Sequence, residues 1–281
     1  MNLDTILYTS QFLPLKDCLS IASIRKDVYH ESKYIYYNRL VEITEDNKEW
    51  VRKYKPKLIV NNIEYIKFPN IHTLNLHING LTRLPDSIDC LVNLQALQLS
   101  CNQLTELPDS IGSFTSLRKL DLSGNKLIKL PDNITKLGNL QELKLDYNQL
   151  VQLPDLIGRL ANLYKLDLFR NKLTLLPDSI GSLCHLRELH LGKNKFTQLP
   201  DSMGNLVTLK NLGLSYIGLT QLPDWIRNLV NLRILRLTGN KLCVLPDWIG
   251  NLVNLQKLYL SGSVHLPDSI TRTSRLRIYN V

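Results

Sequence analysis

Residues 140–162 read LQELKLDYNQLVQLPDLIGRLAN, and this stretch decides the fold. Its pattern, LxxLxLxxNxLxxLPDxIxxLxN, recurs along the chain with a constant step of 23 residues. The alternation of Leu143, Lys144 and Leu145 predicts a short strand with its leucines on the buried face. One unit cannot bury its own leucines, so neighbouring units must stack. The units begin at Ile71, Leu94, Leu117, Leu140, Leu163, Leu186, Leu209, Leu232 and Leu255.

This unit resembles the leucine-rich repeat in its 23-residue LPxxIGxLxxL form. The resemblance implies an α/β solenoid, a right-handed curved superhelix with a parallel sheet on its concave side and short helical turns on its convex side. We expect it to fill residues 71–281 as nine repeats and a terminal strand after Leu276. In each unit, the Asp of LPD is expected to cap the helical turn.

An asparagine recurs where the chain leaves each predicted strand. The family resemblance implies that these asparagines form a hydrogen-bonded ladder that satisfies buried backbone groups. The seventh unit carries Ile217 at this position, which predicts a weak rung. The expected ladder consists of Asn102, Asn125, Asn148, Asn171, Asn194 and Asn240.

The chain before the repeats lacks the 23-residue pattern. Residues 1–45 have apolar residues at helical spacing and predict a small helical module, and residues 46–70 predict a linker and a capping rung. Residues 12–26, FLPLKDCLSIASIRK, resemble the centre of an F-box. That resemblance implies binding to a Skp-type adaptor of a cullin-type ubiquitin ligase; the alternative is that the module only caps the solenoid. The adaptor-binding residues would be Leu13, Leu15, Leu19, Ile21 and Ile24.

The formal net charge of +9 raises the question of an anionic partner. In units three to six, however, opposite charges alternate at the outward strand positions, so this part of the face neutralises itself. A phosphate backbone favours an uninterrupted basic stripe, and we therefore expect no nucleic-acid partner. The two alternating columns are Lys119, Glu142, Lys165 and Glu188, and Asp121, Lys144, Asp167 and His190.

Aromatic and cationic residues gather beside the predicted concave face. Phe169 stands where most units carry a small residue, and exposed aromatics next to Arg are typical of protein interfaces. The alternative is that these side chains pack on one another and stiffen the edge. Trp225 and Trp248 occupy equivalent convex positions and are expected to stack. The predicted binding residues are Tyr147, Phe169, Arg170, His190, Lys193, Tyr216, Arg236 and Tyr259.

Catalysis is not indicated. The sequence contains no phosphate-binding loop, nucleophile elbow or HExxH pair, so we expect neither catalytic residues nor a metal or cofactor. Five scattered cysteines, with no signal peptide or long apolar run, favour the cytoplasm or nucleus over secretion and predict no membrane span. The sequence thus predicts a non-enzymatic protein-recognition module, with a substrate receptor of a ubiquitin ligase as its finer form. The alternative is a scaffold or signalling adaptor similar to leucine-rich proteins that bind Ras-type GTPases.

Overall fold

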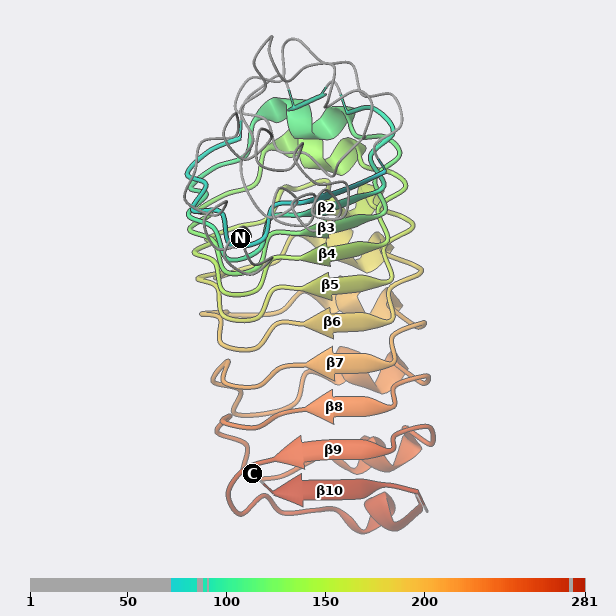
Figure 1. Cartoon of the computed structure of the whole chain (residues 1–281). Coiled ribbons are helices and arrows are strands. Elements are labelled where there is room, and N and C mark those ends of the chain that lie inside the picture. The colour runs from blue at the N-terminus through green and yellow to red at the C-terminus, as the bar shows by residue number, and fades with distance from the viewer. Residues whose placement is uncertain (1–71, 85–87, 90, 273–274, 281) are drawn as a thin grey trace, which may run out of the picture.

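The computed structural model describes residues 72–84, 88–89, 91–272 and 275–280. The predicted helical module, the capping rung and the five adaptor-binding residues lie outside the described residues. The described strands form one open sheet in which every strand pairs in parallel with the next along the chain (Figure 1). The strands are β1 (Thr73–Asn75), β2 (Ala96–Gln98), β3 (Lys119–Asp121), β4 (Glu142–Lys144), β5 (Lys165–Asp167), β6 (Glu188–His190), β7 (Asn211–Gly213), β8 (Ile234–Arg236), β9 (Lys257–Leu260) and β10 (Arg277–Asn280).

The register keeps the 23-residue step of the sequence. Leu143 of β4 pairs with Leu166 of β5, and both are buried. The residues on either side of the central leucine point away from the core because side chains alternate along a strand. Equivalent residues of consecutive units therefore lie beside one another in straight columns across the sheet.

Short 3-10 helices cover the other side of the described stack. All but one begin at the Asp of a Pro-Asp pair, and the exception begins at Ile157. A large apolar residue after the helix closes the turn, as the Leu137 amide does by donating to the Ile134 carbonyl. These helices are η3 (Asp109–Ser113), η4 (Asp132–Lys136), η5 (Ile157–Arg159), η6 (Asp178–Ser182), η7 (Asp201–Asn205), η8 (Asp224–Asn228), η9 (Asp247–Asn251) and η10 (Asp268–Arg272).

The prediction that the Asp of LPD caps the helical turn is wrong in its detail. In η4 the N-cap residue is Pro131, with an extended backbone at φ −68° and ψ 145°, and it makes no side-chain cap hydrogen bond. Asp132 is instead the first helical residue, where its negative charge lies near the free N–H groups of the first turn. Proline serves at the boundary because its ring already fixes φ near the value required.

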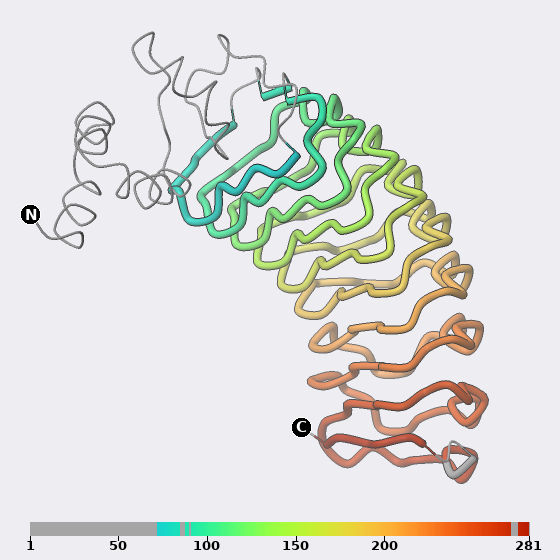
Figure 2. The backbone as a smooth tube through the Cα atoms, turned by 45° about the vertical axis from the view of Figure 1, so that its right-hand side comes forward, coloured from blue at the N-terminus to red at the C-terminus, as the bar shows by residue number. Residues whose placement is uncertain are grey.

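The stack bends into an arc with the 3-10 helices on its outer side (Figure 2). A single core of leucines and isoleucines runs through the arc, with Phe114 as a large, fully buried member. The sheet therefore forms the concave face. These findings confirm the solenoid with a parallel concave sheet.

The asparagine ladder forms as expected from the resemblance. The Asn148 Nδ2 group donates to the carbonyls of Leu122 and Leu145, at 2.9 and 3.0 Å, and its Oδ1 accepts from the Leu127 amide at 3.0 Å. Each asparagine thus ties three backbone groups of two units together. The same geometry recurs at Asn102, Asn125, Asn171, Asn194 and Asn240.

The last unit departs from the period. Ile278 of β10 pairs with Leu258 of β9, a step of 20 residues instead of 23. Ile278 is 39% exposed because no further unit follows it in the described stack. The terminal strand predicted after Leu276 is confirmed, and it leaves part of its apolar surface in contact with solvent.

The two convex tryptophans do not stack as expected. Trp225 is buried in η8, whereas Trp248 in η9 is half-buried against the core. Among the described aromatic rings, the close pairs are Tyr147 with Phe169 and Tyr259 with Tyr279. The repeated position thus places each tryptophan against leucines and not against the other ring.

Candidate functional site

The concave face presents columns of outward-pointing side chains on neighbouring strands. The first column contains the first residue of each strand, and the second column contains the third residue. Lys119, Glu142 and Lys165 follow one another in the first column, as Asp121 and Lys144 do in the second. Parallel strands lie about 4.8 Å apart, so neighbours within a column are in contact range.

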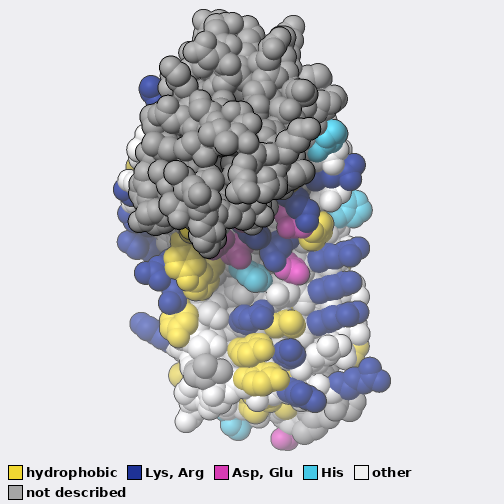
Figure 3. Space-filling view, viewed as in Figure 1, with side chains coloured by type: hydrophobic (Ala, Val, Ile, Leu, Met, Phe, Trp, Pro, Cys, Tyr) yellow, Lys and Arg dark blue, Asp and Glu magenta, His cyan; other side chains and the backbone are white. Residues whose placement is uncertain are grey.

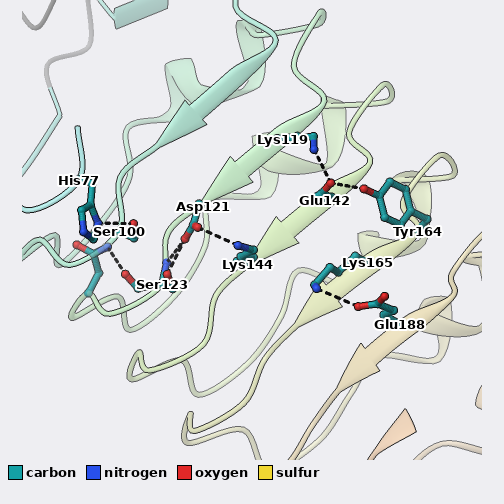
Figure 4. A network of polar contacts seen from close by, with 11 residues as sticks. His77, Ser100, Lys119, Asp121, Ser123, Glu142, Lys144, Tyr164, Lys165 and Glu188 are labelled. Carbon is teal, nitrogen blue, oxygen red and sulfur yellow. Dashed lines mark hydrogen bonds and ion pairs between the residues drawn. The ribbon is translucent and has the colours of Figure 1, made fainter. Parts of the chain in front are cut away.

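The predicted charge alternation is confirmed by three ion pairs on β3–β6, which Figure 4 shows, and by a contact between His190 and Asp167 that is an ion pair only when the imidazole is protonated. In the second column, Lys144 lies 3.3 Å from Asp121, and His190 lies 3.3 Å from Asp167. In the first column, the Lys119–Glu142 distance is 2.7 Å and the Lys165–Glu188 distance is 2.9 Å. The charged side chains of the face over β3–β6 are therefore paired with one another.

Tyr164 is a member of this network that the sequence analysis missed. Its hydroxyl donates to Glu142, which also binds Lys119 (Figure 4). This hydrogen bond, together with burial, raises the pKa of Tyr164 to about 12. Burial alone would raise the pKa of Glu142, but the bonds from Lys119 and Tyr164 outweigh it and lower that pKa. The hydrogen bond to Glu188 likewise raises the pKa of Lys165. Each of these shifts favours the ionisation state that the network requires.

Asp146 differs from these paired groups. It lies just beyond β4, and burial together with the nearby charge of Asp167 raises its pKa to about 6. Asp121 acts in the same direction, whereas the cation of Lys144 opposes the shift. The carboxyl group of Asp146 is therefore an acid whose charge changes in a mildly acidic range.

The edge of the face beyond the strands carries a rim column with a left-handed backbone. Tyr147, Arg170, Lys193 and Tyr216 occupy it on four consecutive units, with φ between 54° and 58°. L-residues adopt this conformation at a cost of about 1 kcal/mol each, which glycine avoids. The column continues through Ile78, Cys101, Gly124, Gly239 and Gly262.

The rim side chains alternate aromatic and cationic groups in contact with one another. Tyr147 meets Phe169 edge to face at a centroid distance of 5.7 Å, and the Arg170 guanidinium lies 5.1 Å from the Tyr147 ring. Lys193 bridges the next units, since its ammonium lies 5.7 Å from the Phe169 ring and 5.0 Å from the Tyr216 ring. Tyr147 and Tyr216 remain 49% and 51% exposed. The predicted rim residues therefore pack on one another and still offer aromatic surface to a partner.

The second column continues on the C-terminal strands as a different arrangement. Arg236 Nη1 donates a 2.5 Å hydrogen bond to Asn211 Oδ1, and its guanidinium lies 5.2 Å from the centroid of Tyr259. Tyr259 stacks on Tyr279 at 4.7 Å with an interplanar angle of 12°. The structure thus brings Arg236 and Tyr259 together as one group, and adds Asn211 and Tyr279, which the sequence analysis did not single out.

The part of the chain that the structure describes contains neither a candidate metal site nor a candidate membrane span. Within it, no group of three or more His, Cys, Asp or Glu side chains is arranged to hold a metal ion. No helix in these same residues is long and apolar enough to cross a membrane.

Comparisons with known proteins agree with the architecture. The family model described as "Leucine rich repeat" matches residues 69–127, a second model of the same description matches residues 139–160, 162–183 and 185–206, and the model described as "Leucine-rich repeat region" matches residues 201–279. The comparison with curated protein sequences finds no match. Family models thus match repeats throughout the described stack.

Three solved structures illustrate the similarity. A leucine-rich repeat protein of Leptospira interrogans is 33% identical, with 75% of this chain and 67% of that chain covered and a TM-score of 0.53. A plant peptide hormone receptor, RGFR1 in complex with RGF2, is 28% identical over 76% of this chain and 43% of that chain, with a TM-score of 0.53. An internalin of Listeria monocytogenes shares the fold at 21% identity over 86% of this chain and 78% of that chain, with a TM-score of 0.62.

Proposed function

The chain belongs to the leucine-rich repeat family, and from this premise we propose that it is a non-enzymatic recognition protein that holds a protein ligand on its concave face. Repeats of this type are typical of protein–protein interaction modules. A solenoid face is a generic scaffold, however, so the proposal depends on the side chains that this chain places there.

The rim column carries the proposal. Tyr147, Arg170, Lys193 and Tyr216 each hold a strained left-handed backbone where Gly124 and Gly239 show that glycine fits the same position. The core does not need these side chains, because they stand at the exposed edge of the face. Large aromatic rings beside cations are the usual anchors of protein interfaces, and a binding role accounts for their retention at the cost of strain.

A solved relative offers independent support. The plant receptor named above is a peptide hormone receptor and was solved in complex with RGF2. The present chain spans less than half of that receptor's length, so the likeness supports a ligand-binding role for the repeats and not the receptor's other activities.

The test is a selection of peptides from a random display library on the full chain, followed by affinity measurements on variants. We expect Tyr147→Asn and Tyr216→Asn to weaken the selected peptides at least tenfold, since asparagine tolerates the left-handed backbone but removes the ring. Leu156→Asn is the matched control because Leu156, next to η5 on the convex side, is also 49% exposed. Equal losses in rim and control variants, or no loss in any of them, would contradict the proposal.

A finer form of the proposal adds a Skp-type adaptor and ubiquitin ligation in the cytoplasm or nucleus. Its support is the sequence of residues 12–26 alone. A pull-down of the full chain with a Skp-type adaptor tests it, with Leu15→Asp and Leu19→Asp as the disrupting changes. Adaptor binding that survives both changes would contradict the F-box form. Binding of a Ras-type GTPase through the rim, with both changes present, would instead favour the alternative of a scaffold or signalling adaptor in which residues 1–57 act only as a cap.

A further inference from the structure

The charge alternation of the concave face ends at β6. Beyond Glu188, the sequence contains eleven Lys and Arg residues but only the four acids Asp201, Asp224, Asp247 and Asp268. Each of these four acids is the first residue of a 3-10 helix, η7 to η10, on the convex side. The described concave face over β7–β10 therefore carries basic residues without a carboxylate among them.

Figure 3 shows the part of the sheet face that the grey atoms leave visible. Acidic side chains lie among basic ones in the middle of this view, whereas basic and hydrophobic side chains dominate the face below them. On β8, β9 and β10 the basic side chains belong to Arg236, Lys257 and Arg277. Lys210 directly precedes β7, and Arg233 directly precedes β8. We call the face formed by these five residues with Asn211, Gly213, Tyr259 and Tyr279 the basic–aromatic surface.

Arg236 is held in place before any ligand arrives. Its hydrogen bond to Asn211 uses one of the five guanidinium N–H donors, and the Tyr259 ring supports the guanidinium from the β9 side. Asn211 is itself within 3.2 Å of His190 Nε2, so a polar chain runs from Asp167 through His190 and Asn211 to Arg236. A fixed guanidinium loses less conformational entropy on binding a carboxylate than a mobile one.

Gly213 interrupts the second column of side chains between His190 and Arg236. It pairs with His190 on β6 and Arg236 on β8, but contributes no side chain. A β-carbon built on Gly213 would lie 3.6 Å from the His190 Cα and 3.7 Å from ring atoms of His190, which are ordinary contact distances. Gly213 is itself buried beside these side chains, so there is room for a β-carbon but the backbone is covered. A ligand group over Gly213 would therefore lie at the level of the Arg236 and His190 side chains.

We propose that the basic–aromatic surface binds an extended acidic polypeptide segment, with one of its carboxylates above Gly213, hydrogen-bonded to Arg236 and close to His190. This inference rests on the proposed function and names the chemistry of the ligand. Charge complementarity supports an anionic ligand. The aromatic rings favour a polypeptide over a single-stranded nucleic acid, because Arg236 and Tyr279 already occupy the faces of Tyr259 on which a base would stack.

The test measures binding of a fluorescein-labelled twelve-residue peptide of alternating Glu and Ser to the full chain by fluorescence anisotropy. Arg236→Glu is expected to weaken binding at least tenfold. Arg227→Glu in η8 is the matched control, because it makes the same charge change in the same part of the stack on the convex side, and it should weaken binding less than twofold. If both variants lost the same affinity for the peptide, binding would depend only on the net charge of the protein, and the proposal would be overturned.

Gly213 supplies a second, independent variant. Gly213→Asp places a carboxylate of the protein itself where the ligand's carboxylate should lie, and is expected to abolish binding of the Glu-Ser peptide. Gly213→Asn has the same size without the charge and should retain most of the affinity. Equal affinity of the Asp and Asn variants, or tighter binding of a twelve-nucleotide oligothymidine than of the peptide, would contradict the proposal.

The library selection described above separates the two proposals. Selected peptides that depend on the rim residues but show no enrichment of Asp and Glu would overturn the acidic-ligand inference and leave the recognition function supported. Enrichment of Asp and Glu, together with loss of binding in Arg236→Glu, supports both.

Discussion

The ring of Tyr216 lies over Gly239, so that a β-carbon added to the glycine would be 2.2 Å from Cδ1 of the tyrosine. The two residues occupy the same rim position on consecutive units, and both have a left-handed backbone, with φ 58° and φ 72°. The Tyr216 amide also donates to the Thr238 carbonyl at 2.8 Å. The position of the rim aromatic therefore depends on the absence of a side chain on the next unit.

Gly239→Ala should displace the Tyr216 ring and lower the free energy of unfolding. Backbone strain at a positive φ costs about 1 kcal/mol, and overpacking against the ring adds about 1–3 kcal/mol. Gly262→Ala is the control, since Gly262 has φ 73° and open space around it. Chemical denaturation should show a clearly larger loss for Gly239→Ala, and Tyr216→Ala in the same chain should remove the difference. Equal losses at the two glycines would mean that the ring moves aside freely.

Asn148→Ala should destabilise the solenoid through the ladder. The change leaves the buried Leu127 amide without its acceptor. The Leu122 and Leu145 carbonyls each lose one donor but keep the bonds from Asn125 and Asn171. An unsatisfied buried group costs about 1–3 kcal/mol and each lost hydrogen bond about 1 kcal/mol, so the expected total is about 2–4 kcal/mol. Urea denaturation measures this directly. Asn139→Ala provides the comparison, because its exposed bond to the Thr115 carbonyl should contribute below about 1 kcal/mol.

Ile217→Asn should be tolerated far better than a usual apolar-to-polar change in a core. At this position the ladder is interrupted, and the Phe196 amide has no asparagine acceptor. An asparagine at 217 would be placed to hydrogen-bond backbone groups equivalent to those that Asn194 and Asn240 bond in the neighbouring units. We expect a change in the free energy of unfolding within about 1 kcal/mol, whereas Leu214→Asn in the adjacent core should unfold the chain. A large loss at 217 would show that the seventh unit has repacked around the isoleucine.

Asp146→Asn should make the protein more stable at pH 7.5 than the parent, but not at pH 4. In the folded protein the pKa of Asp146 is raised from 3.8 to about 6, so the folded state holds this proton more tightly than the unfolded state. The contribution of protonated Asp146 to the free energy of unfolding is fully present below about pH 4 and is lost as the pH rises through about 6. Asparagine cannot ionise and avoids that loss. Denaturation at both pH values checks the prediction, with Asp155→Asn at an exposed turn as the control.

The Lys165–Glu188 pair should contribute little to stability. Both side chains are partly exposed and 2.9 Å apart, and such cross-strand pairs contribute about 0.2–1 kcal/mol. A double-mutant cycle with Lys165→Ala and Glu188→Ala should give a coupling energy in this range that shrinks in 1 M sodium chloride. A coupling that salt does not change would point to hydrogen bonding as its main source.

The periodic features could be predicted from the sequence because they depend only on the register. Leu143 lies beside Leu166, Lys119 beside Glu142, and Asn148 in the ladder, all as a 23-residue step requires. A contact within a column follows from equal spacing, and this part of the face is confirmed in detail.

Contacts that cross from one column to another could not be predicted in this way. The Arg236–Asn211 bond joins a third strand position to a first, and Tyr164 reaches Glu142 from a position before β5. These contacts depend on side-chain rotamers, which the repeat does not specify. Tyr279 was missed for another reason, since the final step of 20 residues shifts it out of the period.

The fold and the charges of the sheet repeat with different periods. The backbone returns to the same place after one unit, whereas the sign of the charge in each column on β3–β6 returns after two. Loss of residues 140–162 would keep the remaining leucines in register but set Lys119 beside Lys165 and Asp121 beside Asp167. Loss of two adjacent units would restore opposite neighbours. Within β3–β6, gain or loss of one unit would therefore place like charges beside one another, whereas gain or loss of two units would keep opposite charges adjacent.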